Sequence, residues 1–214
     1  MTEKKLIKSI NYDEQELISD ILVLHNNNND LDCDLTYSKG NFYNKGIVKP
    51  PKYKFDLYPQ TKDTIQAESQ QLPIKNNTLN SIMFDPIFLS TSGPSLKIDN
   101  KSNHINKRFP PFRTEKLLFQ YYIDTLHECY RILKDDGILI FKIQDKVSSS
   151  IQYFSHVFII NEATKAGFYC KDLFILLAKN RIVADWQLQN QKNARKFHSY
   201  FVVFKKCNKV VKYI

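Results

Sequence analysis

The chain has 214 residues, of which 43% are hydrophobic and 25% charged, a balance typical of soluble globular proteins. No apolar run approaches the roughly 20 residues of a membrane span. The first residues also lack the apolar core of a signal peptide, so we expect a cytoplasmic protein without membrane contact. The formal net charge of +9 favours a polyanionic partner such as nucleic acid, because phosphates neutralised by Lys and Arg release their counterions.

The first half of the chain begins with a predicted helix and continues with predicted strands. Leu and Ile recur at helical spacing over residues 12–25, inside an N-terminal helical segment that we assign to residues 1–30. A run of Asn residues then ends the helix. Apolar runs predict three buried strands and a weaker fourth, at residues 31–37, 53–58, 80–85 and, for the weaker one, 65–68.

The second half of the chain alternates helices with strands. Residues 114–133 form the strongest predicted helix, with Thr114 as its N-cap and a polar run ending in Gly137 as its end. A continuous apolar strand over residues 137–145 follows at once. A further helix and two strands are predicted at residues 155–166, 172–179 and 198–206.

This order of elements predicts an α/β fold with a mostly parallel sheet. We expect the last two strands to pair as an antiparallel hairpin at one edge, and residues 1–214 to form one domain. Two long polar and basic loops, at residues 89–112 and 180–197, lie next to predicted carboxyl ends of strands. Loops of this length are usually functional or disordered, and we expect these two to contact the substrate.

Polar residues gather where the predicted strands end, which is where ligands bind in an open α/β sheet. Asp34, Thr36, Tyr37 and Gly40 follow the first strand, Asp56 ends the second, Glu68 to Leu72 precede the third, and Asp85, Pro86 and Phe88 follow it. The four Cys are widely spaced, without a Cys-x-x-Cys pair, and no His-Glu-x-x-His motif occurs, so we expect no metal. Neither a Gly-x-Ser-x-Gly elbow nor an activated Cys-His pair suggests nucleophilic catalysis.

The motifs resemble the Rossmann-like core of class I S-adenosylmethionine-dependent methyltransferases. More narrowly, residues 31–206 resemble small phage and bacterial DNA amino-methyltransferases in the order and spacing of four motifs. The first motif, Asp-x-Thr-Tyr-Gly-x-Gly, corresponds to Asp34–Gly40, and the second, Asp-Pro-Pro-aromatic, corresponds to Asp85–Phe88. The third, Lys-x-Gln-Asp, corresponds to Lys142–Asp145, and a tail motif corresponds to Asn193–Phe201. The chain departs from the group at Ser38, where Gly is expected, and at Ile87, where a second Pro would stiffen the turn.

The resemblance implies that the cofactor is S-adenosylmethionine. The loop after the first strand would hold its methionine end through Asp34, Thr36, Tyr37 and Gly40, of which Gly40 admits the ligand because it has no side chain. Asp56 would accept the ribose hydroxyls. The segment from Glu68 to Leu72 would contact the adenine.

The resemblance also implies methyl transfer to an exocyclic amino group of a DNA base, adenine N6 or cytosine N4. Such an amine is a poor nucleophile, and accepting its hydrogens at Asp85 and at the Pro86 carbonyl would localise its lone pair. Phe88 would stack on the unpaired base. Basic residues near the C-terminus would contact phosphates, namely Lys192, Arg195, Lys196 and His198.

Two alternatives remain open at this stage. The same motif serves in the methylation of tRNA and rRNA bases, and the chain has no obvious target-recognition domain, so an RNA base methyltransferase is the second reading. The third is a catalytically weakened nucleic-acid-binding module on the same fold, since Ile87 and Ser38 depart from the motifs.

Overall fold

The computed structural model describes residues 6–27, 29–88, 90, 112–180, 189, 191–210 and 212. Most of the two predicted substrate loops, residues 89–112 and 180–197, therefore lies outside the described residues. In the described part, eight strands form one sheet in the spatial order β1 (Ile10–Asn11), β9 (Phe168–Leu177), β10 (His198–Lys206), β6 (Leu133–Ile143), β5 (Leu79–Phe84), β2 (Cys33–Asp34), β3 (Tyr53–Asp56) and β4 (Ile65–Gln66).

The sheet is mostly parallel, as predicted. β4, β3, β2, β5 and β6 pair in parallel, whereas β10 is antiparallel to both of its neighbours, β6 and β9. The predicted antiparallel hairpin of the last two strands is thus confirmed. Two residues of β1 add a parallel strand outside β9, which the sequence did not predict because the strand is so short.

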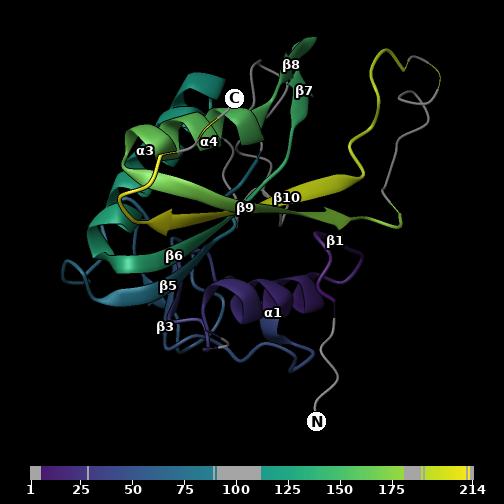
Figure 1. Cartoon of the computed structure of the whole chain (residues 1–214). Helices are drawn as coiled ribbons and strands as arrows, with labels where there is room; N and C mark the ends of the chain where they lie inside the picture. Colours follow the sequence, from purple (N-terminus) through teal and green to yellow (C-terminus); the bar gives the residue numbers. More distant parts are fainter. Residues whose placement is uncertain are drawn as a thin grey trace.

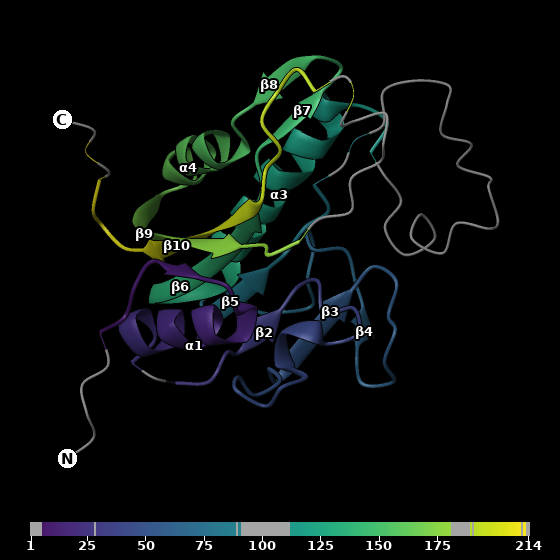
Figure 2. The same cartoon turned by 90° about the vertical axis from the view of Figure 1, so that its right-hand side faces the viewer.

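Helices cover both faces of the sheet (Figures 1 and 2). α3 (Glu115–Ile132) and α4 (Ser155–Lys165) lie on one face, and α1 (Glu14–His25) lies on the other with the short 3₁₀ helix η1 (Asn41–Tyr43). Each face has its own buried cluster, since strand side chains alternate between the faces. Phe84 and Phe141 pack towards α3, and Met83 and Phe201 pack towards α1.

The predicted helices agree with the structure to within about two residues, and capping side chains mark the start of α1 and α3. The Asp13 side chain accepts the first free N–H groups of α1, and Thr114 accepts the N–H of Leu117 in α3. β6 begins at Leu133, directly after α3, and not at Gly137 as predicted. Its register with β5 shifts after Leu79, and Asp136 has a φ of 65°, so the polar run is a bulge within the strand.

A second sheet of two strands stands apart from the first. β7 (Lys146–Ser148) and β8 (Ile151–Tyr153) form an antiparallel hairpin that follows the carboxyl end of β6. Its turn residues Ser149 and Ser150 both have positive φ, at 49° and 64°. Among the described helices, none is both long and apolar enough to span a membrane.

Candidate active site

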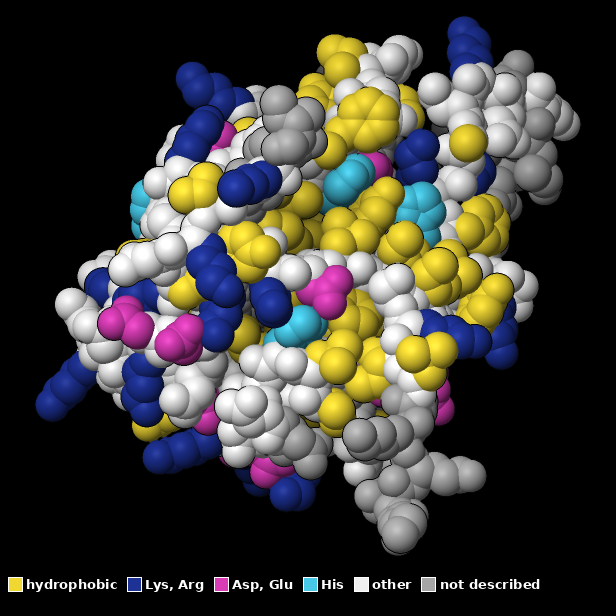
Figure 3. Space-filling view, in the orientation of Figure 1, with side chains coloured by type: hydrophobic (Ala, Val, Ile, Leu, Met, Phe, Trp, Pro, Cys, Tyr) yellow, Lys and Arg dark blue, Asp and Glu magenta, His cyan; other side chains and the backbone are white. Residues whose placement is uncertain are grey.

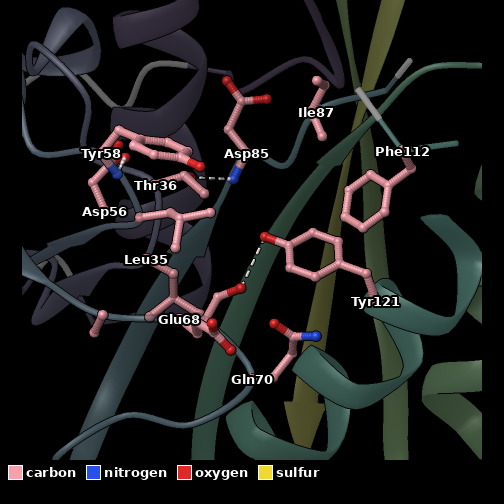
Figure 4. A pocket seen from close by; sticks show the side chains of 13 residues that line it. Leu35, Thr36, Asp56, Tyr58, Glu68, Gln70, Asp85, Ile87, Phe112 and Tyr121 are labelled. Atoms are coloured by element: carbon pink, nitrogen blue, oxygen red, sulfur yellow. Dashed lines mark hydrogen bonds between the residues drawn. The ribbon is translucent and has the colours of Figure 1, made fainter. Parts of the chain in front are cut away.

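One cavity opens at the carboxyl ends of the parallel strands (Figure 4). Its volume is about 360 Å³, within the range of small-molecule sites. Four predicted residues line it: Thr36, Asp56, Glu68 and Asp85. Tyr58, Phe112 and Tyr121, for which the sequence predicts no role, also line the walls, together with Gln70 of the predicted adenine segment and Ile87 of the Asp85–Phe88 motif. The carboxyl ends of the parallel strands therefore bring together carboxylates from three separate segments of the chain, as expected for an open α/β sheet.

The loop after β2 contributes Thr36 to the cavity, while Asp34 is completely buried beside it. The Asp34 carboxylate accepts hydrogen bonds from the Tyr43 hydroxyl at 2.7 Å and from the Thr36 N–H at 2.8 Å. Burial raises the pKa of Asp34 to about 7, despite these two hydrogen bonds. Asp34 does not line the cavity. In this structure its oxygens organise the loop.

Two residues of this loop adopt left-handed backbone conformations. Ser38 has a φ of 52° and Gly40 a φ of 71°, a region that favours Gly. A Cβ on Gly40 would also lie 2.6 Å from the Tyr37 hydroxyl, so no larger residue fits there without rearrangement. Neither Gly40 nor Tyr37 lines the cavity. Gly, which the resemblance leads us to expect at this position, would adopt the φ of Ser38 without strain.

Asp56 joins β3 to the loop after β2. Its Oδ2 accepts the N–H of Ser38 at 2.8 Å, and its Oδ1 accepts the N–H of Tyr58 at 2.7 Å. The residue is 9% exposed and lines the cavity. Each carboxylate oxygen can accept a second hydrogen bond, so Asp56 can bind a hydroxyl donor and still hold the two backbone segments.

The segment from Glu68 to Leu72 turns at the base of the cavity. Glu68 and Gln70 line it, and the Ser69 hydroxyl donates to the Tyr121 hydroxyl of α3 at 2.8 Å. Leu72 points into the core instead, and its N–H donates to Glu128 at 2.6 Å. The predicted contact of Leu72 with a ligand is therefore not made through this cavity.

Side chains from three elements hold the loop from Asp85 to Phe88. The Thr36 hydroxyl accepts the Asp85 N–H at 2.9 Å, and the hydroxyl of Tyr122 in α3 donates to the Ile87 carbonyl at 2.6 Å. Lys146 Nζ donates to the Phe88 carbonyl at 2.7 Å. These bonds restrain the turn at both ends although Ile87 replaces the second Pro of the motif.

The Asp85 side chain forms an ion pair with Lys142 of β6, whose Nζ is 3.1 Å from Asp85 Oδ2. The same ammonium lies 2.7 Å from Glu14 Oε1 of α1 and over the ring of Phe42, 4.9 Å from its centroid. From the sequence, Lys142 is assigned to a motif but no role is predicted for it. Glu14 is predicted only to belong to the N-terminal helical segment. No short-range pattern could have shown that α1 reaches the site.

Other predicted residues lie outside the cavity. Pro86 is buried, and Phe88 is half-buried against the core rather than facing the cavity. The aromatic wall of the cavity is made by Phe112 and Tyr121, whose ring centroids are 5.0 Å apart. The four predicted phosphate contacts lie away from it, at or just before the start of β10: Lys192, Arg195, Lys196 and His198. Among the described residues, no group of His, Cys, Asp and Glu is suited to a metal ion.

No protein-family model and no curated protein matches the sequence. Solved structures resemble its fold. A putative sarcosine dimethylglycine methyltransferase from Galdieria sulphuraria aligns with a TM-score of 0.56 at 11% identity, over 92% of this chain and 86% of that one. An S-adenosylmethionine-dependent methyltransferase from Methanosarcina mazei aligns with a TM-score of 0.51 at 9% identity, over 87% of this chain and 98% of the other.

A putative methyltransferase from Haloferax volcanii, solved with a methyltransferase activator, aligns with a TM-score of 0.50 at 14% identity, over 86% of this chain and 84% of its own. The chain also aligns with a putative DNA modification methylase from Thermus thermophilus at a TM-score of 0.46 and 12% identity, and it spans only 55% of that protein's length. The predicted Rossmann-like fold of class I methyltransferases is thereby confirmed. The substrate does not follow from neighbours this varied.

Proposed function

We propose that the chain is an S-adenosylmethionine-dependent methyltransferase that acts on an exocyclic amino group of a nucleic-acid base, in DNA rather than RNA. One observation carries the proposal: Thr36, Asp56, Glu68 and Asp85, which lie in four separate segments of the chain, line a single cavity at the carboxyl edge of the sheet. The order of the motifs along the chain, which resembles that of DNA amino-methyltransferases, favours DNA as the substrate.

The residues around the cavity suit this cofactor. Asp56 and Glu68 offer carboxylates to the hydroxyl and amino groups of a nucleoside, and Leu35 and Ile87 offer apolar walls beside them. Thr36 lines the end of the cavity next to Asp85. When bound, the cofactor supplies an electrophilic methyl group on a positively charged sulfonium.

The chain itself would activate the acceptor amine. The Asp85 carboxylate and the Pro86 carbonyl accept its hydrogens, so that the nitrogen lone pair is less delocalised into the base. Lys142 favours the ionised form of Asp85, which is the stronger acceptor. Thr36 holds the Asp85 backbone in place.

Labelled-methyl transfer to total DNA and total RNA, followed by mass spectrometry of the nucleosides, tests the proposal. We expect N6-methyladenine or N4-methylcytosine in the DNA. Labelled RNA with unlabelled DNA would establish the RNA alternative. If calorimetry detects no binding of S-adenosylmethionine and no methyl group is transferred, the chain is a binding module and the proposal is wrong.

A further inference from the structure

Three stacked or touching rings lie at the carboxyl end of β6 and the amino end of β10, outside the cavity. His156, in the first turn of α4, stacks on Tyr200 of β10 with ring centroids 4.2 Å apart and an interplanar angle of 25°. The ring of His198 meets Tyr200 edge-on at 5.0 Å, and His198 Nε2 is 3.0 Å from the Tyr200 hydroxyl. We call His156, Tyr200 and His198 the ring row. The proposed chemistry uses none of these side chains.

A buried carboxylate orients the ring row. Asp145, which follows β6 and is 4% exposed, lies 2.8 Å from His156 Nδ1 and also accepts the His156 backbone N–H at 3.3 Å. Burial raises the pKa of the Tyr200 hydroxyl, and the adjacent Asp145 carboxylate raises it further. Gln144 donates to the His198 carbonyl at 2.6 Å. The rings are therefore held in one arrangement before any ligand binds, which lowers the entropy cost of stacking on them.

Exposed apolar side chains border the ring row on one side. Phe154 at the start of α4 is 60% exposed, and Ile151 and Val147 of the β7–β8 hairpin are 56% and 38% exposed. The basic segment of residues 191–197 leads directly into β10 at His198, and Figure 1 shows it at the same end of β10 as the ring row. In Figure 3, histidine side chains lie among hydrophobic ones on this face, with Lys or Arg close by.

The ring row adjoins the proposed catalytic loop. Tyr200 of β10 pairs with Ile143 of β6, and Phe84 of β5 pairs with Phe141 of β6. The amino end of β10 and the carboxyl end of β5 therefore both lie beside the carboxyl end of β6. Lys146, which follows Asp145, donates to the Phe88 carbonyl at 2.7 Å. A ligand lying along this edge would therefore reach the loop that begins at Asp85, on the side opposite the Asp56 end of the cavity.

We infer that this edge binds an unpaired nucleic-acid strand, with its bases against Phe154 and the ring row and its phosphates towards Lys192, Arg195 and Lys196. The inference rests on the proposed function and makes it more specific. The exposed ring of Phe154 and the half-buried rings of the row can stack only on bases whose faces are free, and in a duplex those faces are covered by neighbouring bases. The cations alone would suit either form, because both carry phosphates.

Fluorescence anisotropy with the full chain tests the inference. The probes are a labelled 15-nucleotide DNA strand and the same strand annealed to its complement, both at low salt. We expect the single strand to bind more tightly. Phe154→Ala and His198→Ala should each weaken its binding about tenfold, as loss of one stacked base does, and leave duplex binding within about twofold. Leu24→Ala, a 50% exposed side chain at the opposite edge, is the matched control and should change nothing.

A charge variant separates this inference from the proposed function. Reversing Lys192, Arg195 and Lys196 to Glu should weaken both probes and flatten the salt dependence. The control reverses three exposed lysines at the other edge of the sheet: Lys75, Lys134 and Lys171. If the duplex binds better, or the ring variants bind the strand normally, the inference is wrong while nucleic-acid methylation stands. Absence of binding to either probe also overturns the inference, and the methyl-transfer assay then decides the function independently.

Discussion

The ammonium of Lys142 lies 3.1 Å from Asp85 Oδ2 and is shared with Glu14 at 2.7 Å. Burial raises the pKa of Asp85, and Lys142 opposes this change. Burial lowers the pKa of Lys142, but the two carboxylates outweigh it, so the net pKa of Lys142 is raised. The three residues thus form a charged cluster in which Lys142 stays protonated and favours an ionised Asp85, as the proposed chemistry needs.

Replacing Asp85 should abolish methyl transfer without preventing cofactor binding. Asp85→Ala removes an interaction that is strongest in the transition state, so the loss should appear in turnover. Affinity for S-adenosylmethionine, measured by calorimetry, should stay within a few-fold of wild type, because Asp56 and Glu68 remain. Asp85→Asn controls for the loss of volume. Near-normal turnover of either variant would favour a methyltransferase acting on carbon or oxygen.

Lys142→Met should shift the pH dependence of turnover. Without the ammonium, the pKa of Asp85 rises further, so a smaller fraction is ionised at a given pH and the acidic limb of the profile moves to higher pH. Lys134→Met, at the other end of β6, should leave the profile unchanged. A uniform loss of turnover at every pH would indicate that Lys142 only supports the fold.

Much of the cavity could be predicted from the sequence because two simple rules suffice. Apolar runs mark the strands before Asp34, Asp56 and Asp85, and the carboxyl ends of parallel strands meet at one edge. The predicted parallel sheet and its antiparallel last strands follow from the same runs. Contacts between distant segments could not be predicted in this way. The ion pair between Glu14 and Lys142 is an example, because neither residue lies in a sequence pattern that indicates the other.

Two further features escaped prediction for local reasons. Tyr121 has the helical spacing of a core residue, and only the packed structure shows its ring at the cavity, beside Phe112. The β7–β8 hairpin turns on Ser149 and Ser150, both with positive φ, where Asn-Gly would have been the recognisable signal. The ring row joins α4 to β10 through His156 and Tyr200, which lie far apart in the sequence, so it too appears only in three dimensions.

Ser38→Gly should stabilise the fold. Ser38 adopts a φ of 52°, and a left-handed conformation costs a residue with a side chain roughly 1 kcal/mol. The gain should raise the melting temperature by about 2–4 °C for a chain of this size. Ser38→Ala keeps the Cβ and should give no gain. A lower melting temperature for the Gly variant would show that contacts of the Ser38 side chain outweigh the relief of strain.

Asp56→Asn should weaken cofactor binding by about tenfold or more, since it replaces a charged acceptor of hydroxyl hydrogen bonds by a neutral one. Asn keeps an acceptor oxygen for one of the two backbone bonds that Asp56 makes to Ser38 and Tyr58 and loses the other, a local change that should leave the fold intact. Calorimetry with S-adenosylmethionine measures the change. Asp63→Asn, outside the cavity, is the control. Unchanged affinity in Asp56→Asn would remove Asp56 from the proposed cofactor site.

Asp34 should make the stability of the fold depend on pH. Its pKa is about 7 in the folded chain, where burial disfavours the ionised form, against an ordinary value of 3.8. Between about pH 4 and pH 7 the folded chain therefore holds a proton that the unfolded chain has released. The free energy of unfolding should fall as the pH rises through this window, by on the order of 4 kcal/mol, and then level off.

Asp34→Asn isolates this contribution, because its amide is neutral at every pH, its oxygen can accept the Thr36 N–H and its NH2 group can donate to the Tyr43 hydroxyl oxygen. Urea unfolding between pH 5 and pH 8 should give a flatter dependence for the variant than for wild type. The variant should also be relatively more stable at pH 8 than at pH 5, since wild-type Asp34 is then buried in its ionised form. Asp135→Asn, an exposed site at the opposite edge, should reproduce the wild-type slope. Equal slopes in the Asp34 variant and wild type would mean that Asp34 is already ionised at pH 5 in the folded chain, with Tyr43 and Thr36 compensating fully for its burial.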